Sequence, residues 1–321
     1  MRWAIARAAP LLILSTIVGL VVFALAPRPV SFKEVRRPAP PPVLLDLAQT
    51  RAGWVAAGDR GYLSISADGR LWRPVRSDGG VTLNRVFFRD AEHGWAVGHD
   101  ATILQTRDAG QHWTRGQQTP HIESPLFDIA FAGDRHGWAV GAYGLFLETQ
   151  DGGATWSRRT IATSDEHWYA IVPLGGQNLL IVGENGRVLS SADQGENWLP
   201  LTSPSAGSWF GALVLPDGGA LLFGLRGRLA RLAPDLQTLT AIASPTQASL
   251  YGGARRGDSI WLTGQNGIVL HSRDAGERFS AYVTADKSTA AAILPIPAAA
   301  PNAPLRFMRA GERGLTQGYL P

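Results

Sequence analysis

The side chains that could carry out acid–base chemistry in this chain are few and scattered. Asp165 and Glu166 are adjacent and precede a predicted strand, and a pair of carboxyl groups is what a glycoside hydrolase needs. Two exposed loop charges are the simpler interpretation of this pair. His93 and His136 occupy equivalent turns of a repeat, which indicates structure rather than metal ligation. No Ser-His-Asp spacing or phosphate-binding glycine loop stands out, so we expect no catalysis, no cofactor and no metal.

Other acidic residues recur in one motif. The stretch SADQGENW (191–198) has counterparts in TRDAGQHW (106–113), TQDGGATW (149–156) and SRDAGERF (272–279), and a shortened copy, SADGRLW, ends at Trp72. In the first stretch Asp193 can accept backbone hydrogen bonds, Gly195 can adopt a positive φ, and Trp198 can cover the turn. A catalytic group has no reason to recur in this way, so the motif is interpreted as structural. The residues assigned to it are Asp108, Gly110, Trp113, Asp151, Gly153, Trp156, Asp193, Gly195, Trp198, Asp274, Gly276 and Phe279.

A second landmark appears seven times, ahead of each motif or its expected place. It is a short apolar stretch that ends in glycine and a polar tip, and the copies are VAAGDRG, WAVGHDA, WAVGAYG, LIVGENG, LLFGLRG, WLTGQNG and MRAGERG. Most copies are spaced by about 42 residues, a period typical of repeat architectures. Alternating apolar and polar residues predict four short strands per repeat, as in LFDIAFA, GWAVG, LFLETQ and TWSRRTI. The sequence therefore predicts an all-β fold, a seven-bladed β-propeller.

The last repeat ends before a fourth strand. The segment SFKEVRRP (31–38) resembles TWSRRTIA in having an aromatic residue followed by a basic pair. We expect residues 31–38 to supply the missing strand of the last blade, which would close the ring and remove two sheet edges. The propeller is accordingly assigned to residues 31–321.

Composition narrows the classes of function. The chain has 321 residues, no cysteine and a net charge of +4, and its arginines are scattered rather than gathered in a basic run. Disulfides, thiolate metal sites and a cysteine nucleophile are excluded, and we expect no nucleic-acid partner. Radial repeats can use such a length as one domain, so a monomeric ring is expected.

Residues 1–30 differ from the rest. Ala8–Ala26 is an uncharged, mostly apolar run, and about 19 residues can just span a bilayer. Pro27 directly follows the small-residue triplet 24–26, where proline is expected to block signal peptidase. We expect one uncleaved transmembrane helix in the inner (cytoplasmic) membrane, with the propeller on the periplasmic side, although the basic residues after the run strain the positive-inside rule.

The repeat motifs resemble a known family. HGWAVG occurs twice (93–98 and 136–141), and together with QDGGATW and the other Asp-box motifs it is similar to the photosystem II stability/assembly factor-like propellers. The resemblance implies a non-catalytic scaffold that holds a membrane-protein subunit during assembly of a larger complex. Asp-boxes also occur in sialidases, so a glycoside hydrolase is the alternative, but no RIP-type segment is present. An accessory subunit of a membrane transporter is a third interpretation.

One face of the predicted ring offers a binding surface. It carries the tips after the landmark glycines and the starts of the innermost strands, and Asp-boxes lie on the opposite face. Arginines beside aromatic surface are typical of protein-binding patches. We expect the extended, acidic or carboxylate-terminated tail of a membrane protein to dock there. The residues predicted to bind it are Arg60, Arg85, Arg226, Arg313, Trp168, Trp209 and Tyr251.

Overall fold

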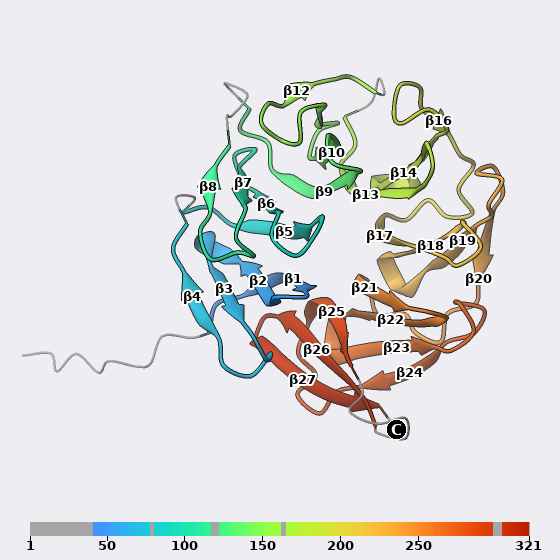
Figure 1. Cartoon of the computed structure of the whole chain (residues 1–321). Helices are drawn as coiled ribbons and strands as arrows, with labels where there is room; N and C mark the ends of the chain where they lie inside the picture. The colour runs from blue at the N-terminus through green and yellow to red at the C-terminus, as the bar shows by residue number, and fades with distance from the viewer. Residues whose placement is uncertain (1–40, 78–79, 117–121, 162–164, 298–303, 321) are drawn as a thin grey trace, which may run out of the picture. The chain divides into compact units, whose positions relative to one another are not determined.

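The computed structural model describes residues 41–77, 80–116, 122–161, 165–297 and 304–320. These residues belong to one compact unit, Pro41–Pro321. Their strands form seven antiparallel sheets that stand around a common centre, with the first strand of each sheet innermost (Figure 1). The predicted seven-bladed β-propeller is confirmed.

Each of the first six blades has four strands, which follow one another in chain order from the centre outward. Blades 1 to 3 consist of β1 (Leu44–Thr50), β2 (Gly53–Gly58), β3 (Leu63–Ser66) and β4 (Arg73–Val75); β5 (Leu83–Phe88), β6 (Gly94–Gly98), β7 (Ile103–Thr106) and β8 (Thr114–Arg115); and β9 (Leu126–Ala132), β10 (His136–Gly141), β11 (Phe146–Thr149) and β12 (Ser157–Arg158). Blades 4 to 6 consist of β13 (Trp168–Gly175), β14 (Asn178–Gly183), β15 (Val188–Ser191) and β16 (Leu199–Pro200); β17 (Trp209–Val214), β18 (Ala220–Gly224), β19 (Leu229–Leu232) and β20 (Leu239–Ile242); and β21 (Leu250–Arg256), β22 (Ser259–Gly264), β23 (Ile268–Ser272) and β24 (Ser280–Val283).

The core lies between neighbouring blades. The second strand of each blade is an almost continuous apolar run because both of its faces are covered, and every residue of β6 is buried. Trp138 of blade 3, for example, packs in one cluster with Trp168 and Ile181 of blade 4. Each such large apolar side chain contributes about 1.5–3 kcal/mol by leaving water. Every blade therefore depends on its neighbours for stability.

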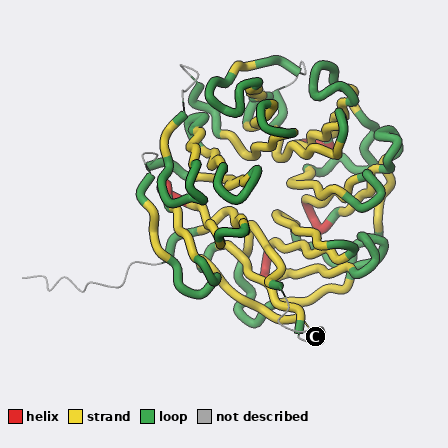
Figure 2. The backbone as a smooth tube through the Cα atoms, in the orientation of Figure 1, coloured by secondary structure: helices red, strands yellow, loops and turns green. Residues whose placement is uncertain are grey.

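The landmark glycines permit the close approach of two strands. At Gly98 a Cβ atom would collide with the backbone carbonyl oxygen of Thr82, which precedes the innermost strand of the same blade. In four blades the tip after the glycine is a short 3-10 turn, visible as the small helical segments of Figure 2. These turns are η1 (Asp59–Gly61), η2 (Glu184–Gly186), η3 (Leu225–Gly227) and η4 (Gln265–Gly267). Their middle residues, among them Arg60 and Arg226, have a positive φ and project from the tip.

The seventh blade shows three strands within the described residues: β25 (Ala290–Ile296), β26 (Leu305–Gly311) and β27 (Gly314–Leu320). The segment expected to complete it, 31–38, lies outside the described residues, so ring closure by this segment stays a prediction. The expected transmembrane helix, Ala8–Ala26, also lies outside them. In the part of the chain that the structure describes, no helix is long and apolar enough to cross a membrane.

Candidate functional site

The Asp-box turns are held by their own side chains. Ser191 donates a hydrogen bond to Asp193 Oδ1 over 2.8 Å, and the Gly195 N–H donates to Ser191 Oγ over 2.9 Å. The Asn197 backbone and side-chain N–H groups both donate to Asp193, which lowers the pKa of its carboxyl group to about 2. Gly195 has a φ of 86°. The side chains of Ser191, Asp193 and Asn197 thus serve the turn itself.

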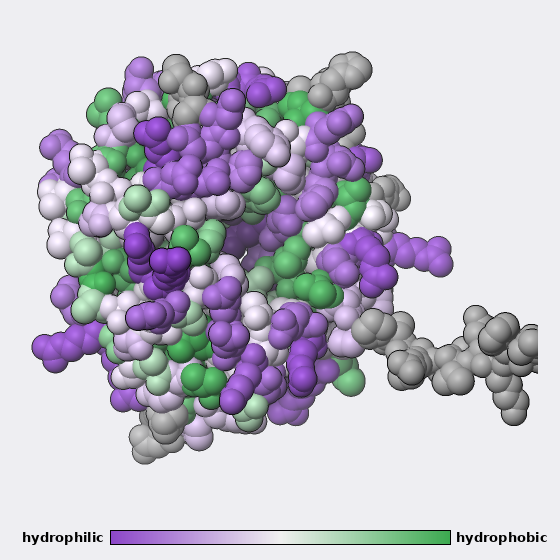
Figure 3. Space-filling view, turned by 180° about the vertical axis from the view of Figure 1, so that it is seen from behind, coloured by the Kyte–Doolittle hydropathy of each residue, from purple (hydrophilic) through white to green (hydrophobic). Residues whose placement is uncertain are grey.

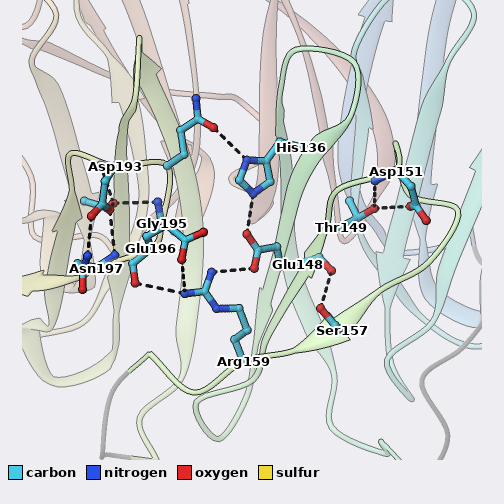
Figure 4. Close-up of polar contacts among 12 residues, drawn as sticks. His136, Glu148, Thr149, Asp151, Ser157, Arg159, Asp193, Gly195, Glu196 and Asn197 are labelled. Carbon is cyan, nitrogen blue, oxygen red and sulfur yellow. Dashed lines mark hydrogen bonds and ion pairs between the residues drawn. The ribbon is translucent and has the colours of Figure 1, made fainter.

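A buried carboxylate joins blade 3 to the Asp-box turn of blade 4 (Figure 4). Glu148 is 4% exposed and contacts His136 Nε2 at 2.6 Å and Arg159 Nη1 at 2.7 Å. Burial opposes ionisation of Glu148, but the hydrogen bonds from Arg159 and His136 outweigh it and lower its pKa. His136 also contacts Gln194 Oε1 through Nδ1, and Arg159 donates a second hydrogen bond from Nη2 to the Glu196 carbonyl oxygen. The network connects two blades, and its buried acid, Glu148, is held by two basic partners.

The carboxyl pair considered for catalysis is not arranged for it. Glu166 Oε1 lies 2.9 Å from Arg187 Nε, in an ion pair, and Asp165 is exposed. Among the described residues no three His, Asp or Glu side chains gather as a metal site would require.

The most distinctive cavity lies on the axis of the ring and has a volume of about 640 Å³. A space-filling view shows the hollow at the centre (Figure 3). All seven innermost strands shift register at the same place, just after their first residue, and the side chain at each shift lines the cavity. Bulges of this kind redirect a side chain. The seven bulge residues are Leu45, Asn84, Phe127, Tyr169, Phe210, Tyr251 and Ala291.

Four consecutive bulge residues form an aromatic arc: Phe127, Tyr169, Phe210 and Tyr251. The ring centroids of successive members are 5.5, 5.3 and 5.4 Å apart, and the interplanar angles are 36°, 73° and 46°. These are favourable distances for tilted and edge-to-face aromatic pairs. All four side chains are half-buried, so the arc is a curved apolar wall that faces the cavity.

Blades 1 to 3 contribute a charged triad to the cavity, which consists of Asp46, Arg85 and Asp128 and adjoins the arc at Phe127. These residues directly follow the bulges of blades 1, 2 and 3. Arg85 Nε lies 3.0 Å from Asp128 Oδ1 and 3.5 Å from Asp46 Oδ2. The two carboxylates are sealed, with side chains 5% and 8% exposed, whereas the Arg85 side chain is 46% exposed. Among the residues that line the cavity, the guanidinium is therefore the charge that meets solvent.

Backbone contacts fix the two carboxylates of the triad. The N–H of Val86 donates to Asp46, and that of Ile171 donates to Asp128, so each acid connects its blade to the next. Burial raises the pKa of both carboxyl groups, although Arg85 opposes this effect. Conversely, the two carboxylates raise the pKa of Arg85. The guanidinium is thereby held cationic and in a fixed position.

The structure corrects two of the residues predicted to bind a partner. Trp168 and Trp209 are each 1% exposed and pack between blades, because they precede the bulge. Their sequence neighbours Tyr169 and Phe210 face the cavity instead. Tyr251 does line it, as its position next to the axis led us to expect.

The predicted arginines are not brought together in one cavity. Arg85 lines the axial cavity, whereas Arg60, Arg226 and Arg313 are exposed at blade tips away from its lining. Arg226 borders a separate groove of about 350 Å³, which Arg228 and Ser205 share. The sequence signal for the correct aromatic set was present: an aromatic residue follows the first residue of four innermost strands at the repeat period.

Comparison with known proteins confirms the family resemblance. The family model described as "Photosynthesis system II assembly factor YCF48" matches residues 117–205. The chain is 28% identical to the photosystem II assembly protein Ycf48 of Thermosynechococcus vestitus over 73% of this chain and 81% of that protein. It is 34% identical to the photosystem II assembly lipoprotein Ycf48 of Picosynechococcus sp. over 60% of this chain and 57% of that protein.

Solved structures show the same fold. A structure of YCF48 bound to D1 peptide has a TM-score of 0.69 and 22% identity and covers 88% of this chain and 95% of that one. YCF48 from Cyanidioschyzon merolae has a TM-score of 0.68 and 17% identity, with 88% and 96% covered. The WD40 propeller domain of Doa1 scores 0.68 at only 10% identity, with 88% and 93% covered, which illustrates how many sequences adopt this ring.

Proposed function

We propose that this protein is a non-catalytic scaffold that holds a segment of a membrane protein while a larger complex is assembled. The similar curated proteins are photosystem II assembly proteins by name, and one similar solved structure contains a D1 peptide. The observation that carries the proposal for this chain is the aromatic arc, a half-buried apolar wall at the mouth of the axial cavity. A half-buried aromatic wall that faces a cavity is typical of a binding site rather than of a solvated face.

The docking surface in this proposal combines the arc with the arginines at the tips of the same face. Tyr169 and Phe210 replace the two buried tryptophans of the original prediction. Arg60, Arg226 and Arg313 supply exposed cations around the ring, and a guanidinium matches a carboxylate in bidentate geometry. An extended segment with acidic groups is the partner that such a surface suits.

We further propose that residues 1–30 anchor a monomeric propeller in the cytoplasmic membrane, with the ring on the periplasmic side. One of the similar proteins is named a lipoprotein, so attachment to a membrane has a parallel among its relatives. This chain has no cysteine, and Ala8–Ala26 would take the place of a lipid. Anchoring raises the effective concentration of membrane-protein tails near the ring without any new contact. Alkaline phosphatase fused to the C-terminus tests the orientation, because it is active only when exported.

The proposal is tested by pull-down of the full chain from mild detergent, followed by mass spectrometry. The parent chain is expected to retain one membrane protein, and Phe210→Ala should lose it. The double variant Arg226→Glu/Arg313→Glu should also lose it, while melting within a degree or two of the parent, because exposed tip charges contribute little to folding. Tyr319→Ala is the matched control, since Tyr319 is an exposed aromatic residue away from the cavity lining.

One outcome would contradict the proposed surface, and another would contradict the proposed function. Capture that survives both sets of changes but fails when the Asp-box face is altered would place the docking site on the other side of the ring. A partner retained in stable stoichiometry with a mature transporter would identify an accessory subunit instead of an assembly factor.

A further inference from the structure

We propose that the axial cavity is a binding site for a small organic acid with a flat ring, which pairs its carboxylate with Arg85 and stacks its ring on the aromatic arc. This inference does not depend on the docking of a partner. The small ligand would enter the mouth of the ring, whereas the proposed partner would extend from the arc to the arginines at the tips, so the two would share the arc.

The size of the cavity fits such a ligand. Its volume of about 640 Å³ lies in the range of roughly 300–1,000 Å³ that small-molecule sites occupy. The lining is mostly apolar, and its charged groups lie on blades 1 to 3. A wall of apolar residues with a few convergent polar groups is the usual composition of a small-molecule site.

The geometry of the triad selects the charge of the ligand. Arg85 uses Nε for both carboxylates, and no described residue accepts a hydrogen bond from its two terminal nitrogens. These terminal N–H groups form the fork that binds carboxylates in pairs of hydrogen bonds. The two acids cannot bind a cationic ligand in the same way, because their oxygens are nearly inaccessible and accept bonds from backbone N–H groups.

The arc selects the body of the ligand. Phe127, its first member, is the residue directly before Asp128, so the apolar wall begins beside the charged triad. Arg85 contacts Asp128 at 3.0 Å, so a molecule that pairs with Arg85 lies at the Phe127 end of the arc. Successive rings of the arc are tilted by 36° to 73°, which offers both faces and edges to a flat ligand.

Blades 4 to 7 leave room for this ligand. At the position that holds Asp46, Arg85 and Asp128 in blades 1 to 3, the other blades have Ala170, Gly211, Gly252 and Ala292. Long side chains on all seven strands would meet at the axis. Blades 1 to 3 carry charged side chains at this position, and blades 4 to 7 carry alanine or glycine. The Arg85 guanidinium therefore faces an open space.

Three probes of equal size test the charge preference: 2-naphthoate, 2-naphthamide and 2-naphthylmethylammonium, titrated into the purified protein by calorimetry and observed by ligand NMR. We expect saturable binding of 2-naphthoate with one site per chain. The neutral amide and the cation should bind at least tenfold more weakly. Equal binding of all three probes, or no saturable binding of 2-naphthoate, would overturn the proposal.

Variants locate the site. Arg85→Lys keeps a cation between the two acids but removes the fork, and it should weaken 2-naphthoate binding at least tenfold. Phe210→Ala leaves the triad intact and should weaken binding several-fold, so the test stands even if the Arg85 variant folds poorly. Arg278→Gln and Tyr319→Leu are controls at exposed sites outside the cavity lining, and they should bind like the parent. Binding of 2-naphthoate that survives both cavity variants would mean that the probe sits elsewhere.

Discussion

Replacement of Trp113 by alanine should destabilise the protein by about 3–5 kcal/mol. The indole is 4% exposed, packs edge-on against Phe88 with ring centroids 6.1 Å apart, and donates a hydrogen bond from Nε1 to the Gly110 carbonyl oxygen over 3.0 Å. Alanine loses both the buried ring and the hydrogen bond. Trp113→Phe should cost only about 1–2 kcal/mol, because most of the aromatic surface stays and the loss is chiefly one hydrogen bond. Phe279 already occupies the corresponding position of blade 6.

The assay is equilibrium unfolding in denaturant, followed by tryptophan fluorescence and by circular dichroism so that coincidence of the two transitions checks two-state behaviour. Leu71→Ala is the control, because Leu71 lies in the shortened Asp-box turn of blade 1 and is 82% exposed. It should change the free energy of unfolding by less than about 0.5 kcal/mol. If Trp113→Ala unfolds like the parent, or if the alanine and phenylalanine variants are equally destabilised, the reasoning on the buried turn is refuted.

Three further predictions concern other parts of the molecule. Deletion of residues 1–38 should lower the melting temperature relative to deletion of 1–29, because only the longer deletion removes the expected closing strand; equal melting temperatures would refute closure by this segment. The folded pKa of Asp193 is about 2, below its unfolded value, so its contribution is present above about pH 4 and is lost as the pH falls towards 2. Asp193→Asn should reduce this acid-dependent loss of stability in pH-series melts, and an unchanged acid profile would contradict it. A panel of aryl glycosides, sialosides included, should show no turnover, and turnover abolished by Asp165→Asn or Glu166→Gln would establish an enzyme.

The fold could be predicted because two motifs recur along the sequence at a regular spacing. At each of the seven landmark glycines a Cβ atom would collide with a backbone carbonyl oxygen. The Asp-box turn is held by hydrogen bonds between groups only a few residues apart. Both are local interactions, so their residues keep a fixed spacing that can be recognised without coordinates. Blade number follows directly from the count of such landmarks.

The site was only half predictable, for a physical reason. Trp168 and Tyr169 are neighbouring aromatic residues with similar preferences, and a register shift after the first residue decides which one faces the axis. A shift of one residue exchanges the two faces of a strand, so the aromatic pair in one blade does not tell which member faces the axis; only comparison of four blades shows the recurring second position. The triad was missed because Asp46, Arg85 and Asp128 are about 40 residues apart and become neighbours only when equivalent strands meet at the centre.

Apart from Arg85 and Asn84, the side chains that face the mouth of the ring are separate from those that hold the blades together. The other six bulge residues line the cavity, while the residues beside them pack the blade or join it to the next. Substitutions at these bulge positions should therefore leave the packing of the blades largely unchanged. Exchange of Leu45 or Ala291 for aromatic residues would extend the arc further around the ring, and basic residues there would add exposed cations. A small library over these two positions should yield stable rings with different ligand preferences.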